Sequence, residues 1–150
     1  MMLKECFIFD IDGTLADGSH RIHHIVRTDG QPKDWDTYFA AMRDDTPIVP
    51  IQRLANALSV CYDIIYVSGR PEEYREHTET WLAKHGMPPG QLYMRPLADR
   101  RDDNIIKIEI LAQIKQEGFF PIMAFDDRNR VVKAWREVGI CCAQVADGDF

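Results

Sequence analysis

Five short apolar runs alternate along the chain with segments whose apolar residues repeat at helical spacing. The runs cover residues 3–9, 62–67, 91–94, 121–125 and 140–145. In the first run Phe7, Ile8 and Phe9 follow one another without a polar residue, which is typical of a strand covered on both faces. Strands that alternate with helices favour a parallel sheet between two helical layers. We therefore predict an α/β fold with five mainly parallel strands.

The helical segments support this architecture. Their apolar residues recur three and four positions apart: Ile51, Leu54, Ala55 and Leu58; Tyr74, Trp81, Leu82 and His85; Ile106, Ile110 and Ile114; Val131, Ala134, Trp135 and Val138. Pro71 opens the second of these helices, and Gly86, Gly118 and Gly139 follow the last three, as expected for helix ends. The pattern predicts a Rossmann-like three-layer α/β/α sandwich.

One segment interrupts this alternation. Between Asp17 and Pro47 we expect no strand, but a helix capped by Asp34 and carrying an apolar stripe of Trp35, Tyr38, Phe39 and Met42. Some thirty residues cannot bury much of a core alone, so this stripe should dock on the main body. We predict a single domain over residues 1–150, with a helical cap inserted at about 17–46.

Length, charge and cysteine content narrow the class of protein. The 150 residues suggest one domain, and the net charge of −6 gives no general attraction to nucleic acid or to an anionic membrane. A polyanionic substrate must then be held by a local basic cluster. The four cysteines lack zinc-ligand spacing, and no apolar run has membrane-spanning length or the form of a signal peptide. We expect a cytoplasmic protein that does not bind membranes.

Polar residues follow three of the predicted strands. Asp10 and Asp12 come after the first, residues 68–70 (Ser-Gly-Arg) after the second, and Asp126 and Asp127 after the fourth. Ligands of open α/β sheets bind at the carboxyl ends of the strands, where these groups should converge. Carboxylates so close together repel one another unless a cation lies between them, and Mg²⁺ is the small hard cation that suits them.

These residue types fit the hydrolysis of a phosphate monoester. Asp10 can act as the nucleophile, and Asp12 as the general acid and then the general base. Lys107, expected in the first turn of its helix, can place an ammonium beside Asp10. Mg²⁺ would be held by Asp10, by a backbone carbonyl near Asp12, and by an acid of the Asp126–Asp127 pair.

Ser68 and the backbone N–H groups at Gly69 can donate hydrogen bonds to phosphate oxygens. Each group has a simpler interpretation: Asp127 could cap a helix, Lys107 could be a surface charge, and residues 68–71 could form an ordinary turn. Their joint occurrence favours a catalytic site.

Together, Asp10-Ile11-Asp12-Gly13-Thr14, Ser68-Gly69-Arg70, Lys107 and Asp126-Asp127 resemble the four motifs of the haloacid dehalogenase superfamily of phosphohydrolases. Over nearly the whole chain the sequence resembles the 3′-phosphatase domains of phage-type polynucleotide kinase–phosphatases, most weakly between His23 and Thr46. The resemblance implies that Arg21, Arg70 and Asp103 lie in or beside the site. No P-loop occurs, so a role in nucleic-acid repair would be that of the phosphatase alone.

Several alternatives stay open. The substrate could be a 3′-phosphorylated nucleic-acid end, a small nucleotide or another metabolite phosphate. A phospho-receiver is disfavoured, because Arg95-Pro96 stands after the third strand, where such domains carry their acceptor aspartate. A module that only binds phosphate is disfavoured because the catalytic side chains are present.

Some residues outside the motifs also have two interpretations. Trp35, Tyr38 and Phe39 could stack on bases but are more often core. Arg100 and Arg101 could contact a second phosphate, and a metal site at His20, His23 and His24 is disfavoured. DNA or RNA preference, protein partners and a homo-oligomeric state stay undetermined.

Overall fold

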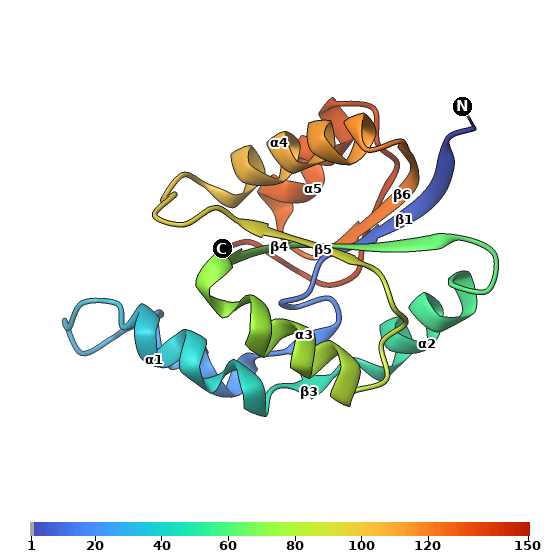
Figure 1. Ribbon diagram of the computed structural model, residues 1–150. Coiled ribbons are helices and arrows are strands. Elements are labelled where there is room, and N and C mark those ends of the chain that lie inside the picture. The colour runs from blue at the N-terminus through green and yellow to red at the C-terminus, as the bar shows by residue number, and fades with distance from the viewer. Residues whose placement is uncertain (1) are drawn as a thin grey trace.

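A computed structural model describes residues 2–150 and confirms the five-stranded parallel sheet (Figure 1). Its strands are β1 (Lys4–Phe9), β4 (Asp63–Pro71), β5 (Gln91–Arg95), β6 (Phe119–Asp126) and β7 (Cys142–Gln144), in the order β5-β4-β1-β6-β7. Each predicted run overlaps one of them. The first strand of the sequence is thus the middle strand of the sheet.

The chain leaves β1 for β4 on one side and returns to β6 on the other. Phe7 of β1 is paired in register with Ile64 of β4 and with Met123 of β6, and all of these pairings are parallel. The point where a parallel sheet reverses its strand order opens a crevice at the carboxyl ends of the strands. This crevice lies directly beyond β1, where Asp10 follows Phe9.

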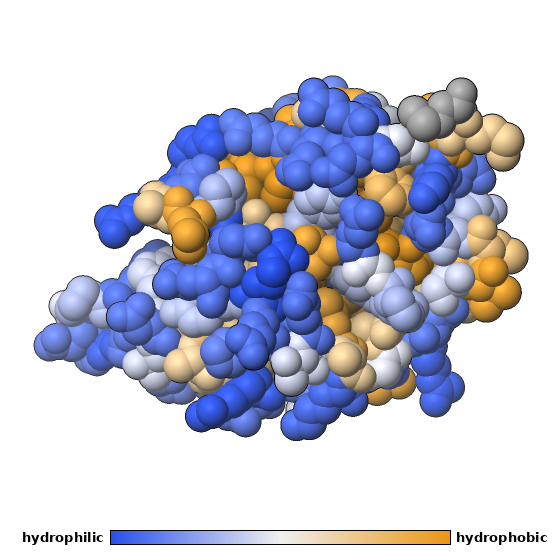
Figure 2. Space-filling model, in the orientation of Figure 1, coloured by the Kyte–Doolittle hydropathy of each residue, from blue (hydrophilic) through white to orange (hydrophobic). Residues whose placement is uncertain are grey.

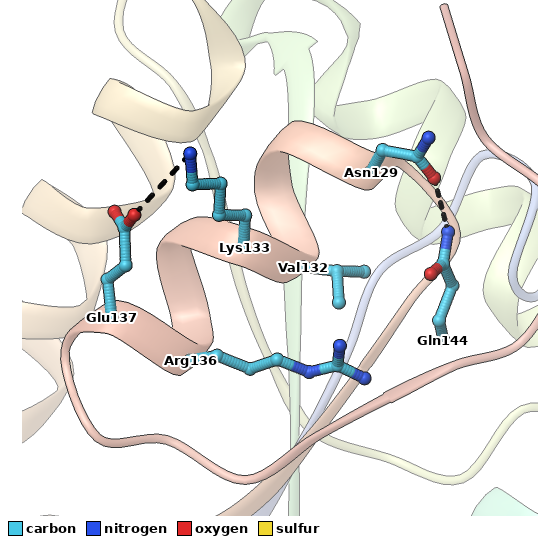
Figure 3. A pocket seen from close by; sticks show the side chains of 6 residues that line it. All are labelled: Asn129, Val132, Lys133, Arg136, Glu137 and Gln144. Atoms are coloured by element: carbon cyan, nitrogen blue, oxygen red, sulfur yellow. Dashed lines mark hydrogen bonds and ion pairs between the residues drawn. The ribbon is translucent and has the colours of Figure 1, made fainter.

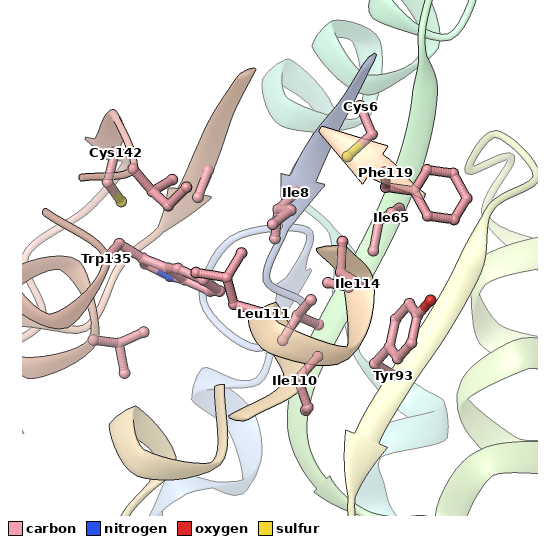
Figure 4. Packing of buried hydrophobic residues seen from close by; sticks show 14 of the residues in the cluster. Cys6, Ile8, Ile65, Tyr93, Ile110, Leu111, Ile114, Phe119, Trp135 and Cys142 are labelled. Atoms are coloured by element: carbon pink, nitrogen blue, oxygen red, sulfur yellow. The ribbon is translucent and has the colours of Figure 1, made fainter. Parts of the chain in front are cut away.

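Two helical layers cover the sheet, with α4 (Asp103–Gln116) and α5 (Asn129–Glu137) on one face and α2 (Val49–Leu58) and α3 (Arg75–Lys84) on the other (Figure 1). Ile8 packs in a cluster with Ile110 and Trp135 of the first layer (Figure 4). Its neighbour Phe9 belongs to a second cluster, with Trp81 of α3. Ile8 and Phe9 are both buried, which contributes about 1.5–3 kcal/mol for each side chain and fixes the end of β1.

Residues 17–46, hereafter the insertion, begin and end in a short antiparallel pair. β2 (Ala16–Asp17) pairs with β3 (Thr46–Pro47), so the expectation of no strand between Asp17 and Pro47 was wrong at both ends. Strands of two residues are too short to show a period-2 pattern. The pair joins the two ends of the insertion and makes it a separate arm at the lower left of Figure 1.

Within the insertion lie the 3₁₀ helices η1 (Ser19–His24) and η2 (Ala41–Asp44) and, between them, α1 (Trp35–Ala40). Asp34 caps α1 as predicted, accepting a hydrogen bond from the Thr37 N–H. The expected apolar stripe docks in part: Met42 of η2 is buried and Phe39 lies 4.9 Å from Tyr74, whereas Trp35 is exposed. A third 3₁₀ helix, η3 (Glu72–Tyr74), leads from β4 into α3.

The other structural expectations concern helix ends and cysteines. Gly86, Gly118 and Gly139 end their helices with positive φ, as predicted. All four cysteines are free thiols, two of them buried. Across residues 2–150, no helix combines the length and the apolar character needed to cross a membrane.

Candidate active site

A cleft of about 850 Å³ lies between the insertion and the carboxyl edge of the sheet. Figure 2 shows it as a notch on the left of the molecule, between the arm that carries α1 and the loop from β5 to α4. Its lining includes the predicted site residues Asp10, Asp12, Gly69, Arg70, Asp103, Lys107, Asp126 and Asp127.

A smaller hollow of about 420 Å³ lies along α5 and is shown in Figure 3. Its polar groups already pair with one another: Gln144 donates to Asn129 at 2.6 Å, and Lys133 lies 3.8 Å from Glu137. No group of carboxylates converges there, so the cleft is the better candidate for chemistry.

Three carboxylates, Asp10, Asp126 and Asp127, meet at the bottom of the cleft and form what we call the acidic cluster. Each offers an oxygen within 4.8 Å of the others. The ammonium of Lys107 donates to Asp10 Oδ1 at 2.7 Å and to Asp126 Oδ2 at 2.8 Å. Lys107 is only 3% exposed and starts the second turn of α4, because that helix begins at Asp103, slightly earlier than expected.

Further hydrogen bonds fix the two carboxylates to which Lys107 donates, those of Asp10 and Asp126. Thr14 donates its hydroxyl to Asp10 Oδ2 at 3.0 Å. Asp126 Oδ1 accepts the backbone N–H of Asp127 at 2.9 Å and that of Arg128 at 3.3 Å. Asp127 is not the N-cap of α5, whose N-cap residue is Arg128, so its side chain is left for the cleft.

Gly13 lets the loop after β1 pass against Asp127. Its φ is +81°, and a Cβ built there would lie 2.1 Å from Asp127 Oδ2, closer than any real contact. Any other residue at position 13 would therefore be strained and would displace the Asp127 carboxylate.

Asp10 and Asp127 hold protons more tightly than ordinary carboxylates. Burial and the charge of Asp126 raise the pKa of Asp10 well above its usual value, and the same two causes raise the pKa of Asp127 to about 6. Lys107 opposes this effect, but one ammonium does not balance three carboxylates. An all-oxygen set with excess negative charge fits a hard divalent cation.

Asp12 points elsewhere. Its carboxylate accepts from Arg70 Nη2 at 2.7 Å and from Arg21 Nη2 at 2.7 Å, and it is not part of the acidic cluster. Burial would raise the pKa of Asp12, but the guanidinium groups of Arg70 and Arg21 hold it below its usual value. The expected metal contact through a backbone carbonyl near Asp12 stays a prediction.

Asp45 holds the two arginines, and sequence reasoning missed it. It is 2% exposed and accepts from Arg21 Nε and Nη2, each at 2.8 Å, and from Arg70 Nη2 at 3.4 Å. His20 Nε2 lies 2.8 Å from the same carboxylate, and Trp81 donates to the Asp45 carbonyl. No motif marks this residue, since it stands beside another aspartate in an irregular part of the insertion.

The remaining predicted residues occupy different places. Gly69 lines the cleft, while Ser68 is fully buried and its hydroxyl accepts the backbone N–H of Arg70 at 3.1 Å. Asp103 lies on the cleft wall and accepts from Arg128 at 2.6 Å and Arg130 at 2.9 Å. Asp103 therefore orients two arginines of the wall.

The chain is similar to several known proteins. The family model of the polynucleotide kinase PNKP phosphatase domain matches residues 4–150. A chain of the Pnkp1/Rnl/Hen1 RNA repair complex is 34% identical, with a TM-score of 0.81 over 99% of this chain and 44% of that chain. A putative bifunctional polynucleotide kinase/RNA ligase of Autographa californica nuclear polyhedrosis virus is 27% identical over 87% of this chain and 18% of its own length.

The fold also occurs among more distant proteins. A haloacid dehalogenase-like hydrolase of Streptococcus pneumoniae superposes with a TM-score of 0.65 at 17% identity, over 95% of this chain and 84% of that one. The chain spans less than half the length of the two more similar relatives.

We predict that Asp45→Asn lowers the free energy of unfolding by about 3–5 kcal/mol, because two buried guanidinium groups lose the carboxylate between them. The neighbouring exposed Asp44 provides the matched control, and Asp44→Asn should change stability by less than about 0.5 kcal/mol. Urea unfolding at neutral pH measures both. Equal midpoints for the two variants would show that Asp45 does not hold the arginines.

Proposed function

The chain belongs to the family of polynucleotide kinase PNKP phosphatase domains, within the haloacid dehalogenase superfamily, and from this we propose that it is a Mg²⁺-dependent phosphomonoesterase that removes 3′-phosphates from polynucleotide ends. The observation that carries the proposal is the acidic cluster with Lys107 at the bottom of an open cleft. We propose further that the insertion acts as a cap over this cleft.

In the first step, an oxygen of Asp10 attacks phosphorus and the bond to the 3′ oxygen breaks, which leaves the phosphoryl group on Asp10. Lys107 lowers the pKa of Asp10, against the burial and the charge of Asp126 that raise it, and its ammonium also attracts the phosphoryl oxygens. Water then attacks the aspartyl phosphate and releases inorganic phosphate. A Mg²⁺ ion held by Asp10, Asp126 and Asp127 would neutralise the charge that otherwise repels the phosphate from these acids.

Asp12 supplies and recovers the proton in this scheme. Its pairing with Arg70 and Arg21 keeps it ionised at neutral pH in the free protein, which suits the general base that activates water. Its role as acid requires the incoming phosphate dianion to raise the pKa of Asp12. In this scheme the role of Arg70 and Arg21 is to position the Asp12 carboxylate.

Phosphate oxygens would be held by Lys107 and by backbone N–H groups at Gly69. The Ser68 hydroxyl is buried and accepts the backbone N–H of Arg70, which fixes the Gly69 backbone. The O–H of Ser68 would in addition donate to a phosphate oxygen. Asp103 acts through Arg128 and Arg130 on the cleft wall.

The choice of a nucleic-acid 3′ end rests on the relatives. They are named for polynucleotide kinase activity and for an RNA repair complex, and the chain spans only part of each. We propose that this chain likewise works on broken nucleic-acid ends, together with partners that supply the other repair steps.

The first test is a substrate panel. With Mg²⁺ present, we expect release of phosphate from 3′-phosphorylated oligonucleotides and little from 5′-phosphorylated ones. Asp10→Asn should lower kcat by at least about 10³-fold, because the nucleophile is lost. The control is Asp63→Asn, an exposed acid at the opposite end of β4, which should retain activity.

A lack of 3′ activity with retained hydrolysis of nucleoside monophosphates would reject the polynucleotide substrate and favour the small-nucleotide alternative. Full activity of Asp10→Asn would reject the proposed nucleophile.

The second test concerns metal and pH. The raised pKa of Asp127 means that the folded protein without metal binds a proton more tightly than the unfolded chain. Stability from this proton is fully present below the usual pKa of 3.8, is partly retained at pH 5 and is lost as pH rises through about 6. Mg²⁺ competes with the proton, so it should raise the unfolding temperature clearly at pH 8 and little at pH 5.

Thermal unfolding with MgCl₂ and with EDTA at the two pH values measures this. Asp127→Asn should abolish the difference in unfolding temperature between the MgCl₂ and EDTA samples, whereas Asp63→Asn should keep that difference. A Mg²⁺ shift of the same size at pH 5 and pH 8 would contradict the assignment of the acidic cluster as the metal site.

A further inference from the structure

Four aromatic side chains line the cleft: Trp35, Tyr38, Phe39 and Tyr74, which we call the aromatic wall. The first three belong to α1, which buries none of its residues, and Trp35 is 46% exposed. The rings are therefore not the core of the insertion. Trp35 is exposed and Tyr38, Phe39 and Tyr74 are half-buried, so the aromatic wall offers the cleft an apolar surface that a ligand can cover.

The rings form a continuous series. Trp35 and Phe39 are stacked, with centroids 5.8 Å apart and planes 24° apart, and Phe39 lies 4.9 Å from Tyr74. At the inner end, the Arg21 guanidinium lies 4.2 Å from the Tyr38 centroid. Since Arg21 also binds Asp12, the aromatic wall reaches the proposed proton donor.

The other wall of the cleft carries guanidinium groups, from the loop between β5 and α4 and from the start of α5. Arg101 is paired with Asp99 and Glu109, and Arg128 with Asp103. Arg100 is exposed and has no hydrogen-bond or ion-pair partner within residues 2–150. A cleft with rings on one wall and an unpaired guanidinium on the other complements a base attached to a phosphodiester.

The size of the cleft limits the occupant. About 850 Å³ lies in the range of pockets for small ligands and suits one or two nucleotides rather than the end of a duplex. A base that stacks on the aromatic wall must also be free of its pairing partner.

We propose that the aromatic wall is a subsite for the unpaired 3′-terminal nucleoside of the substrate, an inference that rests on the proposed function. The base stacks on the aromatic wall while the 3′-phosphate reaches Asp10. Stacking does not read hydrogen-bond patterns, so the subsite accepts all four bases. It selects single-stranded or frayed ends over blunt duplex ends.

Binding can be tested without turnover, because Trp35 is the exposed one of the three tryptophans. Trp81 and Trp135 are 2% and 1% exposed. A short single-stranded oligonucleotide with a 3′-hydroxyl, added in EDTA, should quench the fluorescence of Trp35. The same oligonucleotide with an abasic 3′ terminus should quench it much less, and Trp35→Phe should remove the quench. Equal quenching by both oligonucleotides, or none by either, would overturn the proposal.

Kinetics give the second reading. For 3′-phosphorylated oligonucleotides, kcat/KM should be about 5- to 150-fold higher with a terminal base than with an abasic terminus, the range expected for one stacked base. Trp35→Ala should bring this ratio toward 1. Phe120→Ala, which removes an exposed ring of β6 outside the cleft lining, should leave the ratio unchanged.

The two proposals fail in different ways. Rapid hydrolysis of both substrates with a ratio of 1 in the unaltered protein would overturn the subsite and leave the phosphatase intact. Hydrolysis of neither would reject the phosphatase, and the fluorescence measurement would then decide the subsite alone.

Discussion

The ammonium of Lys107, held between Asp10 and Asp126, is the interaction on which the site depends. The middle strand β1 and its neighbour β6 both end in carboxylates, which would repel one another when buried. Lys107 projects from α4 into this position and makes the arrangement tolerable. Removing one member of such a buried set typically costs about 3–5 kcal/mol, because the others are left without their counter-charge.

The charges of the cleft fall into two groups with different balance. Asp12 and Asp45 face Arg21 and Arg70, two acids with two guanidinium groups, and this group is neutral. The acidic cluster sets three carboxylates against Lys107 and keeps an excess of negative charge. This difference supports the proposals that a cation is held at the acidic cluster and that Asp12 moves a proton without holding that cation through its carboxylate.

The sequence predicts the parts of the fold that follow from long patterns. Uninterrupted apolar runs such as residues 7–9 identify buried parallel strands, and the rule that ligands bind at the strands' carboxyl ends places Asp10 near Asp126. The two-residue strands β2 and β3 carry no pattern, and Asp45 carries no motif. An amphipathic stripe shows that Trp35 and Phe39 share a face, but not whether that face meets protein or solvent.

The central claim is that the Asp10 carboxylate becomes phosphorylated. Acid quenching during turnover of an oligonucleotide with a labelled 3′-phosphate, followed by peptide mapping, tests it most directly. The account predicts that the label is found on the peptide that contains Asp10, is lost in alkali as expected for an acyl phosphate, and is absent in Asp10→Asn. Label on another residue, or turnover with no labelled protein at any time, would contradict it.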